Sequence, residues 1–117
     1  MPFVSVTTNQ SLSQSVKAEL LSEISFNCAE ILGNSEDYVM VRLNLGQSLF
    51  FARTEEPAIF AELFSIGLSA IDVPKLSCAL CKFLSERLGV GPKRIYLNFR
   101  DVPRRMWGWN GSTFAKN

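Results

Sequence analysis

The chain has 117 residues, of which 47% are apolar, with a formal net charge of +1 and a sequence pI near 7.7. This length is sufficient for one hydrophobic core, and the balanced charge provides no basic field that would attract nucleic acid. The absence of histidine excludes histidine–cysteine zinc sites and histidine-dependent nucleophile pairs, and three cysteines without framework spacing indicate reduced thiols. No segment is long and apolar enough to span a membrane and no secretory signal is visible, so we expect a cytoplasmic protein without metal or cofactor.

The first expected element is a strand at residues 3–7, which directly follows Met1 and Pro2. Proline has no backbone N–H and is tolerated at the first residue of a strand, so Pro2 could simply mark where the strand starts. The alternative is chemical. Cells commonly remove an initiator methionine that precedes a small residue, and this would leave Pro2 with a free secondary amine, a potential base in a chain without histidine.

A helix and a second strand are expected to complete the first half of the chain. Ser11 or Ser13 can cap the start of the helix, and Gly33 suits a left-handed C-cap. The alternating run at residues 38–45 predicts the strand, and a β-α-β crossover makes the two strands parallel. The apolar residues at helical spacing are Val16, Leu20, Ile24 and Ile31.

The second half repeats this pattern. Residues 31–44 and 87–100 align with Leu32-Gly33 on Leu88-Gly89, which suggests a duplicated unit with halves at about 1–56 and 57–117. Strands are expected at 58–66 and 94–99. Between them lies a helix capped by Asp72, with Pro74 in its first turn and Gly89 at its end. The fold class is therefore α+β: two β-α-β units in one domain, with a four-stranded mixed sheet and both helices on one of its faces.

The second face of this sheet would remain uncovered. The strand at 58–66 is apolar on both sides, and residues 49–52 offer a further apolar strand. We therefore expect self-association to cover the free face.

Three further features have competing interpretations. Cys78 and Cys81 have the spacing of a redox or metal pair, but they fall inside the second helix, so buried core thiols are favoured for them and for Cys28. Aromatic residues near the C-terminus, at 106–115, either fill the core or form the wall of a pocket. Cations gather just before them, at Arg100, Arg104 and Arg105, and either face solvent or attract a small anion.

Four segments in order along the chain resemble the macrophage migration inhibitory factor family of the tautomerase superfamily. They are Met1-Pro2 before a strand, EEPAIFAELFSIG (55–67), LSERLGVGPKRIYLNFRD (84–101) and WGWNGSTFA (107–115). The resemblance implies two β-α-β units assembled as a homotrimer whose sheets form a barrel.

The resemblance also implies a function. Pro2, freed by removal of Met1, would act as a general base in keto–enol tautomerisation of arylpyruvates such as phenylpyruvate, and of dopachrome-like compounds. Burial beside apolar and cationic groups would lower the pKa of its amine toward neutrality. An alternative implied by vertebrate and parasite relatives is a cytokine-like protein that binds a host receptor and is secreted without a signal peptide.

Individual positions carry over from the family. The backbone N–H of Ile66 would help to hold the substrate carboxylate, while Tyr96 and Asn98 would reach the pocket from the neighbouring subunit. Aromatic residues around the pocket would be Tyr38, Trp109 and Phe114.

Three positions depart from the family pattern. Asn34 stands where a carboxylate-binding lysine is frequent, so a nearby arginine would have to supply the charge, and the candidates are Arg100, Arg104 and Arg105. Trp107 replaces a smaller apolar residue and would reshape the pocket mouth. Residues 58–61 lack the vertebrate cysteine pair, so its proposed thiol-redox activity should be absent.

Overall fold

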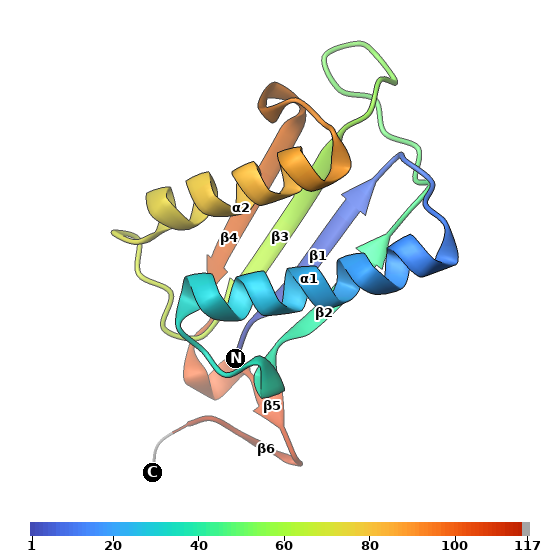
Figure 1. Cartoon of the computed structure of the whole chain (residues 1–117). Coiled ribbons are helices and arrows are strands. Elements are labelled where there is room, and N and C mark those ends of the chain that lie inside the picture. The colour runs from blue at the N-terminus through green and yellow to red at the C-terminus, as the bar shows by residue number, and fades with distance from the viewer. Residues whose placement is uncertain (116–117) are drawn as a thin grey trace.

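The computed structural model describes residues 1–115, which form two successive β-α-β units (Figure 1). The first unit comprises β1 (Phe3–Thr8), α1 (Gln14–Leu32) and β2 (Met40–Asn44), and the second comprises β3 (Ile59–Ser65), α2 (Val73–Leu88) and β4 (Ile95–Asp101). Single 3₁₀ turns precede β2 and β4, at η1 (Glu36–Tyr38) and η2 (Pro92–Arg94). After β4 follow a third such turn, η3 (Arg104–Met106), and a short hairpin of β5 (Gly108–Trp109) and β6 (Ser112–Thr113).

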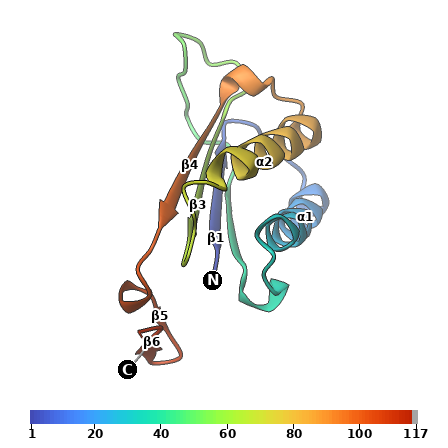
Figure 2. The ribbon, with the colours of Figure 1, turned by 90° about the vertical axis from the view of Figure 1, so that its left-hand side faces the viewer.

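The four long strands form one mixed sheet in the order β2-β1-β3-β4. The pairs β1–β2 and β3–β4 are parallel, as each crossover requires, and β1 pairs antiparallel with β3. Both helices cover the same face of the sheet, and Figure 2 shows the opposite face bare. The expected fold class is therefore confirmed, including the pseudo-symmetry of its two units.

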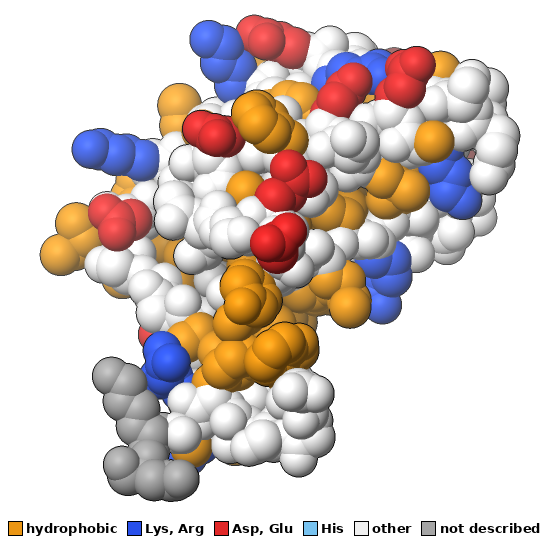
Figure 3. All heavy atoms as spheres, turned by 60° about the horizontal axis from the view of Figure 1, so that its bottom comes forward, with side chains coloured by type: hydrophobic (Ala, Val, Ile, Leu, Met, Phe, Trp, Pro, Cys, Tyr) orange, Lys and Arg blue, Asp and Glu red, His pale blue; other side chains and the backbone are white. Residues whose placement is uncertain are grey.

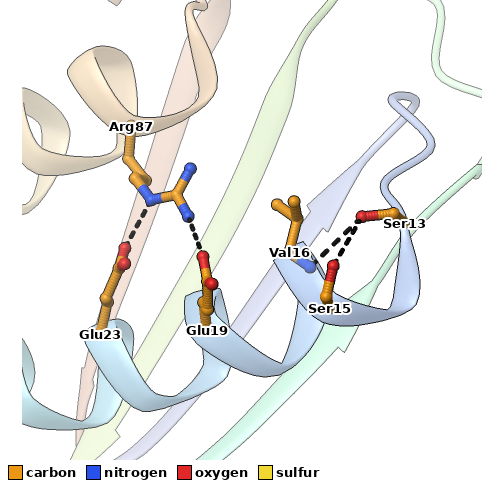
Figure 4. Close-up of polar contacts among 6 residues, drawn as sticks. All are labelled: Ser13, Ser15, Val16, Glu19, Glu23 and Arg87. Atoms are coloured by element: carbon orange, nitrogen blue, oxygen red, sulfur yellow. Dashed lines mark hydrogen bonds and ion pairs between the residues drawn. The ribbon is translucent and has the colours of Figure 1, made fainter.

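The helix ends follow local chemistry with one exception. The Ser13 hydroxyl accepts a hydrogen bond from the Val16 backbone N–H at 3.3 Å and so caps α1 (Figure 4). Gly33 and Gly89 end the two helices at φ values of 68° and 67°, where a side chain would be strained. Asp72 stands at the N-cap position of α2 as predicted, but its backbone is in the right-handed helical region (φ −84°, ψ −18°) and its carboxylate accepts no capping hydrogen bond.

The core lies between the sheet and the helices. Strand residues Val4 and Val6 pack against helix residues that recur every four positions, which places them on one face of each helix. On α2 these residues are Leu76, Leu80, Leu84 and Leu88. At the edge of the core, the Arg87 guanidinium joins the two helices by pairing with Glu23 and, at 3.7 Å, with Glu19 (Figure 4).

The strand predicted at residues 49–52 is absent. Phe51 and Thr54 form an isolated bridge around Ala52 and Arg53, whose φ values of 53° and 64° are left-handed and incompatible with an extended strand. The Arg94 guanidinium donates to the carbonyl oxygens of Phe51 and three later residues of this loop, at 2.8 to 3.4 Å. The loop's carbonyl groups are thus satisfied by a distant arginine rather than by a partner strand.

The thiols also differ from expectation. Cys28 is buried in the core as predicted, but Cys78 is exposed and Cys81 is half-buried. The reason is helical phase: Cys78 lies two residues from Leu76 and Leu80, so it faces away from the apolar stripe. Within residues 1–115, no three potential metal ligands among His, Cys, Asp and Glu lie close enough to hold an ion, and no helix is long and apolar enough to cross a membrane.

A thiol-reactive probe should distinguish these three cysteines. We expect Cys78 and Cys81 to react in the folded protein at pH 8 and Cys28 to react only after unfolding, because burial raises the pKa of the Cys28 thiol to about 12. Absorbance of the released chromophore, with and without denaturant, counts the reactive groups. Reaction of all three thiols at equal rates in the native protein would contradict this assignment.

Candidate active site

A cavity of about 660 Å³ opens at the end of the sheet where the chain begins. Figure 1 shows the N-terminus close to η1 and to β5, and these segments together with β1 and β3 supply the cavity walls. Figure 3, viewed toward this end, shows hydrophobic side chains gathered on the surface. The cavity is thus a largely apolar space built from segments far apart in the sequence.

Pro2 lies at the base of this cavity and is fully buried. Its carbonyl oxygen accepts a hydrogen bond from the Met40 backbone N–H at 3.1 Å, which ties the start of β1 to β2. Met1 is half-buried and lines the cavity. Burial, followed by the nearby positive charge of Arg104, lowers the pKa of the Met1 amine below its ordinary value.

An aromatic wall, formed by Tyr38, Trp109 and Phe114, stands beside Pro2. The Trp109 ring packs edge-on against Tyr38 at 5.9 Å and stacks on Phe114 at 5.8 Å between centroids. The Phe114 backbone N–H donates to the Trp107 carbonyl at 3.2 Å, which holds the C-terminal segment in place. Trp107 lines the same cavity, so four of the aromatic residues singled out in the sequence lie together with Pro2.

Sequence reasoning missed two further aromatic side chains of the cavity, Phe3 and Phe64. Their rings meet at 5.9 Å because antiparallel register places the two residues opposite each other on β1 and β3. It also missed Asp37, an exposed residue of η1 and the one acidic residue among the cavity walls within residues 1–115. Register and loop path decide these positions, and no motif in the sequence marks them.

Asn34 and Ile66 do not join Pro2 in this cavity. They line a separate hollow of about 260 Å³ between the end of α1 and the segment that leads into α2. Asp72 and Lys75 contribute opposite charges to the same hollow. Neither Asn34 nor Ile66 lines the cavity around Pro2.

Tyr96, Asn98 and Arg100 alternate along β4 on the uncovered face of the sheet. Tyr96 pairs with Phe60 of β3. Phe60 lies four positions from Phe64 at the edge of the cavity, so Tyr96 stands roughly 13 Å from that edge. Its side chain is 61% exposed and contacts Phe51. The Arg100 guanidinium lies 5.3 Å from the centroid of the Phe64 ring, at the margin of the cavity. None of the three lines the cavity of its own chain within residues 1–115.

Comparison with known proteins places this arrangement in a family. The family model "Macrophage migration inhibitory factor (MIF)" matches residues 1–115. Among curated relatives, the macrophage migration inhibitory factor of Meriones unguiculatus is 37% identical over 116 residues, covering 98% of this chain and 100% of that protein. The homologue from Trichuris trichiura is 36% identical over 115 residues, covering 97% of this chain and 100% of that protein.

Solved structures agree with the sequence matches. The crystal structure of the homologue from Prochlorococcus marinus superimposes with a TM-score of 0.88 at 37% identity, covering 97% of this chain and 99% of the other. The structure of the macrophage migration inhibitory factor from Trichinella spiralis gives a TM-score of 0.87 at 31% identity, covering 95% of this chain and 98% of the other. The chain belongs to the macrophage migration inhibitory factor family, within the tautomerase superfamily.

Proposed function

We propose that this protein is a keto–enol tautomerase that acts on arylpyruvates such as phenylpyruvate, and on dopachrome-like compounds, with Pro2 as the general base after Met1 is removed. The observation that carries the proposal is the burial of Pro2 at the base of an aromatic cavity. Family membership supports the isomerase assignment.

The chemistry requires one group that can accept and return a proton. The free Pro2 nitrogen takes a proton from the carbon next to the keto group, and the electron pair of that C–H bond forms the enolate. The resulting ammonium then protonates the enolate oxygen, so atoms and charge balance over the reaction. An ordinary α-amino group has a pKa of about 8, and the apolar surroundings of Pro2 favour its neutral form, which keeps the base available near neutral pH.

The cavity walls suit a flat aromatic substrate. An aryl ring can stack on Trp109 or Phe114 and meet the edges of Phe3 and Phe64, because offset and edge-on aromatic contacts are both favourable. Such contacts orient the substrate side chain toward Pro2 without requiring a metal or a histidine. A small aliphatic keto acid would leave much of this surface exposed to water.

We further propose that the active assembly is a homotrimer in which Tyr96 and Asn98 complete the cavity of a neighbouring subunit. Both side chains are exposed on the uncovered sheet face and lie too far from Pro2 of their own chain to act there. A neighbouring copy that covers this face would bury their side chains together with that of Phe60, which is 38% exposed.

The direct test replaces Pro2 with glycine, written Pro2→Gly, and follows phenylpyruvate enol formation by absorbance. We expect kcat/KM to fall by about tenfold or more, because the primary amine of glycine is less basic than the secondary amine of proline and is held less firmly in position. Pro92→Gly, at an exposed proline of η2, is the matched control and should retain wild-type activity. Undiminished activity of Pro2→Gly, in preparations whose intact mass confirms loss of Met1, would refute the mechanism.

A second candidate is a cytokine-like role in which the protein is secreted and binds a receptor. The observation in its favour is the 36% to 37% identity with rodent proteins named macrophage migration inhibitory factor. If the Pro2→Gly variant binds cells as well as the wild-type protein does, the two roles are separable.

A further inference from the structure

The cavity around Pro2 has an uneven distribution of charge. Asp37 on η1 is the one acidic residue that lines it within residues 1–115. Arg104 belongs to η3, whose last residue Met106 also lines the cavity, and Arg104 itself lies just outside this lining beside the C-terminal aromatic segment. An arylpyruvate carries its own carboxylate, which Asp37 repels and a cation on the η3 side attracts. The charges therefore favour one orientation of an anionic substrate over the reverse.

Arg104 is held in a fixed position at this side of the cavity. Its Nε–H donates to the Phe114 carbonyl oxygen at 3.1 Å, and the Phe114 ring is part of the aromatic wall. Within residues 1–115, its terminal guanidinium nitrogens have no hydrogen-bond partner and no carboxylate lies within ion-pair distance. The charge lies close enough to the chain's N-terminal amine to lower the pKa of that group. Arg104 is thus anchored through one nitrogen and open to a ligand through the others.

Other polar groups are less well placed for this task. The guanidinium groups of Arg42 and Arg100 lie over the Phe3 and Phe64 rings, at 5.2 and 5.3 Å, on the uncovered sheet face. Asn34 carries no charge and lines a different hollow, in which Asp72 offsets the charge of Lys75. Arg104 differs from the groups compared here because a hydrogen bond anchors it to the backbone of the aromatic wall, while its terminal donors have no partner within residues 1–115.

We propose that Arg104 forms an anion subsite that binds the carboxylate of the arylpyruvate substrate at the η3 side of the cavity. This inference rests on the proposed tautomerase function and specifies how that site recognises its substrate. A guanidinium matches a carboxylate with two parallel N–H donors, which gives direction as well as affinity. With the carboxylate at Arg104, the aryl ring rests on the apolar walls and the carbon that loses its proton faces Pro2.

Arg104 then has a second effect on the reaction. The positive charge that attracts the substrate also disfavours protonation of the Pro2 amine, so its removal should raise the pKa of the base. The acid limb of the kcat/KM profile should accordingly move to higher pH in a variant that lacks this charge, because an ammonium with a higher pKa loses its proton only at higher pH. A role limited to holding the C-terminal segment would not produce this shift.

The experiment compares phenylpyruvate with its methyl ester, which lacks the negative charge, after subtraction of the uncatalysed rate. For Arg104→Met, we expect KM for the acid to rise about tenfold or more while KM for the ester changes less than about twofold, with a small change in kcat. Arg104→Lys should recover most of the affinity for the acid. The matched control is Lys93→Met, which also removes one positive charge, from an exposed lysine of η2 at the start of β4, away from the cavity. It should leave both KM values unchanged.

Each other result overturns the inference. Equal changes for acid and ester would mean that Arg104 acts through the structure of the C-terminal segment, and no change for either would mean that it does not contact the substrate. Should Arg104→Met fail to fold, Arg104→Gln retains an N–H donor for the Phe114 carbonyl without the charge, and the same comparison applies to it. Failure of the tautomerase proposal is distinct, because the wild-type protein would then be inactive or insensitive to Pro2→Gly.

Discussion

A chain extended before Pro2, so that the Pro2 nitrogen stays in a peptide bond, is expected to lose activity toward phenylpyruvate by a factor of about 10² to 10⁴. An amide nitrogen has almost no basicity, so the proton acceptor disappears while the cavity walls remain. Met1 itself lies in the cavity, so its retention also occupies substrate space. The measurement is kcat/KM from enol absorbance on one preparation, before and after a protease removes the extension to expose Pro2.

The matched control for this experiment is a cleavage site that leaves a single glycine ahead of Pro2. This product has a free primary amine, but one residue away from the buried position of Pro2. It should stay as inactive as the uncleaved chain, because a base must lie within hydrogen-bond reach of the proton that it removes. Equal activity of all three forms would show that the Pro2 nitrogen takes no part in the reaction.

The substitution Leu80→Ala is expected to lower the free energy of unfolding by about 3 kcal/mol. Leu80 is 2% exposed at the centre of the core, where α2 packs on the sheet, and its truncation leaves a cavity that the rigid surroundings fill only partly. Denaturant titration followed by circular dichroism gives the value. Protein concentration must be fixed, since self-association would add to the apparent stability.

Lys82→Ala is the control for this measurement, because Lys82 is exposed two residues further along the same helix. Its effect should stay within about 0.5 kcal/mol, as for most exposed positions. A similar loss of stability in both variants would mean that the apolar stripe of α2 does not form the core contact described above.

Much of the fold could be predicted because its signals are local. The serine before α1, the glycines after both helices and the four-residue spacing of leucines act over one or two turns, and the structure has them as expected. The absent strand at residues 49–52 is an error of a different kind, because the distant Arg94 holds the segment around Phe51 folded onto itself. The error at Cys78 is local: helical phase turns Cys78 outward, although Leu76 and Leu80, two residues away on either side, are buried.

The residues of the candidate site also fall into those that the sequence marks and those that only the tertiary structure brings together. The sequence by itself determined the candidate base, since Pro2 follows Met1 in a chain without histidine, and it marked the C-terminal aromatic residues by their irregular spacing. Only the tertiary structure decided which groups meet. Antiparallel register brings Phe64 to Phe3, and the path of the C-terminal segment carries Trp109 to the cavity of Pro2. The turn after α1 places Asn34 in another hollow. These positions depend on contacts between segments up to about a hundred residues apart, whereas caps and periodicity act only between neighbours along the chain.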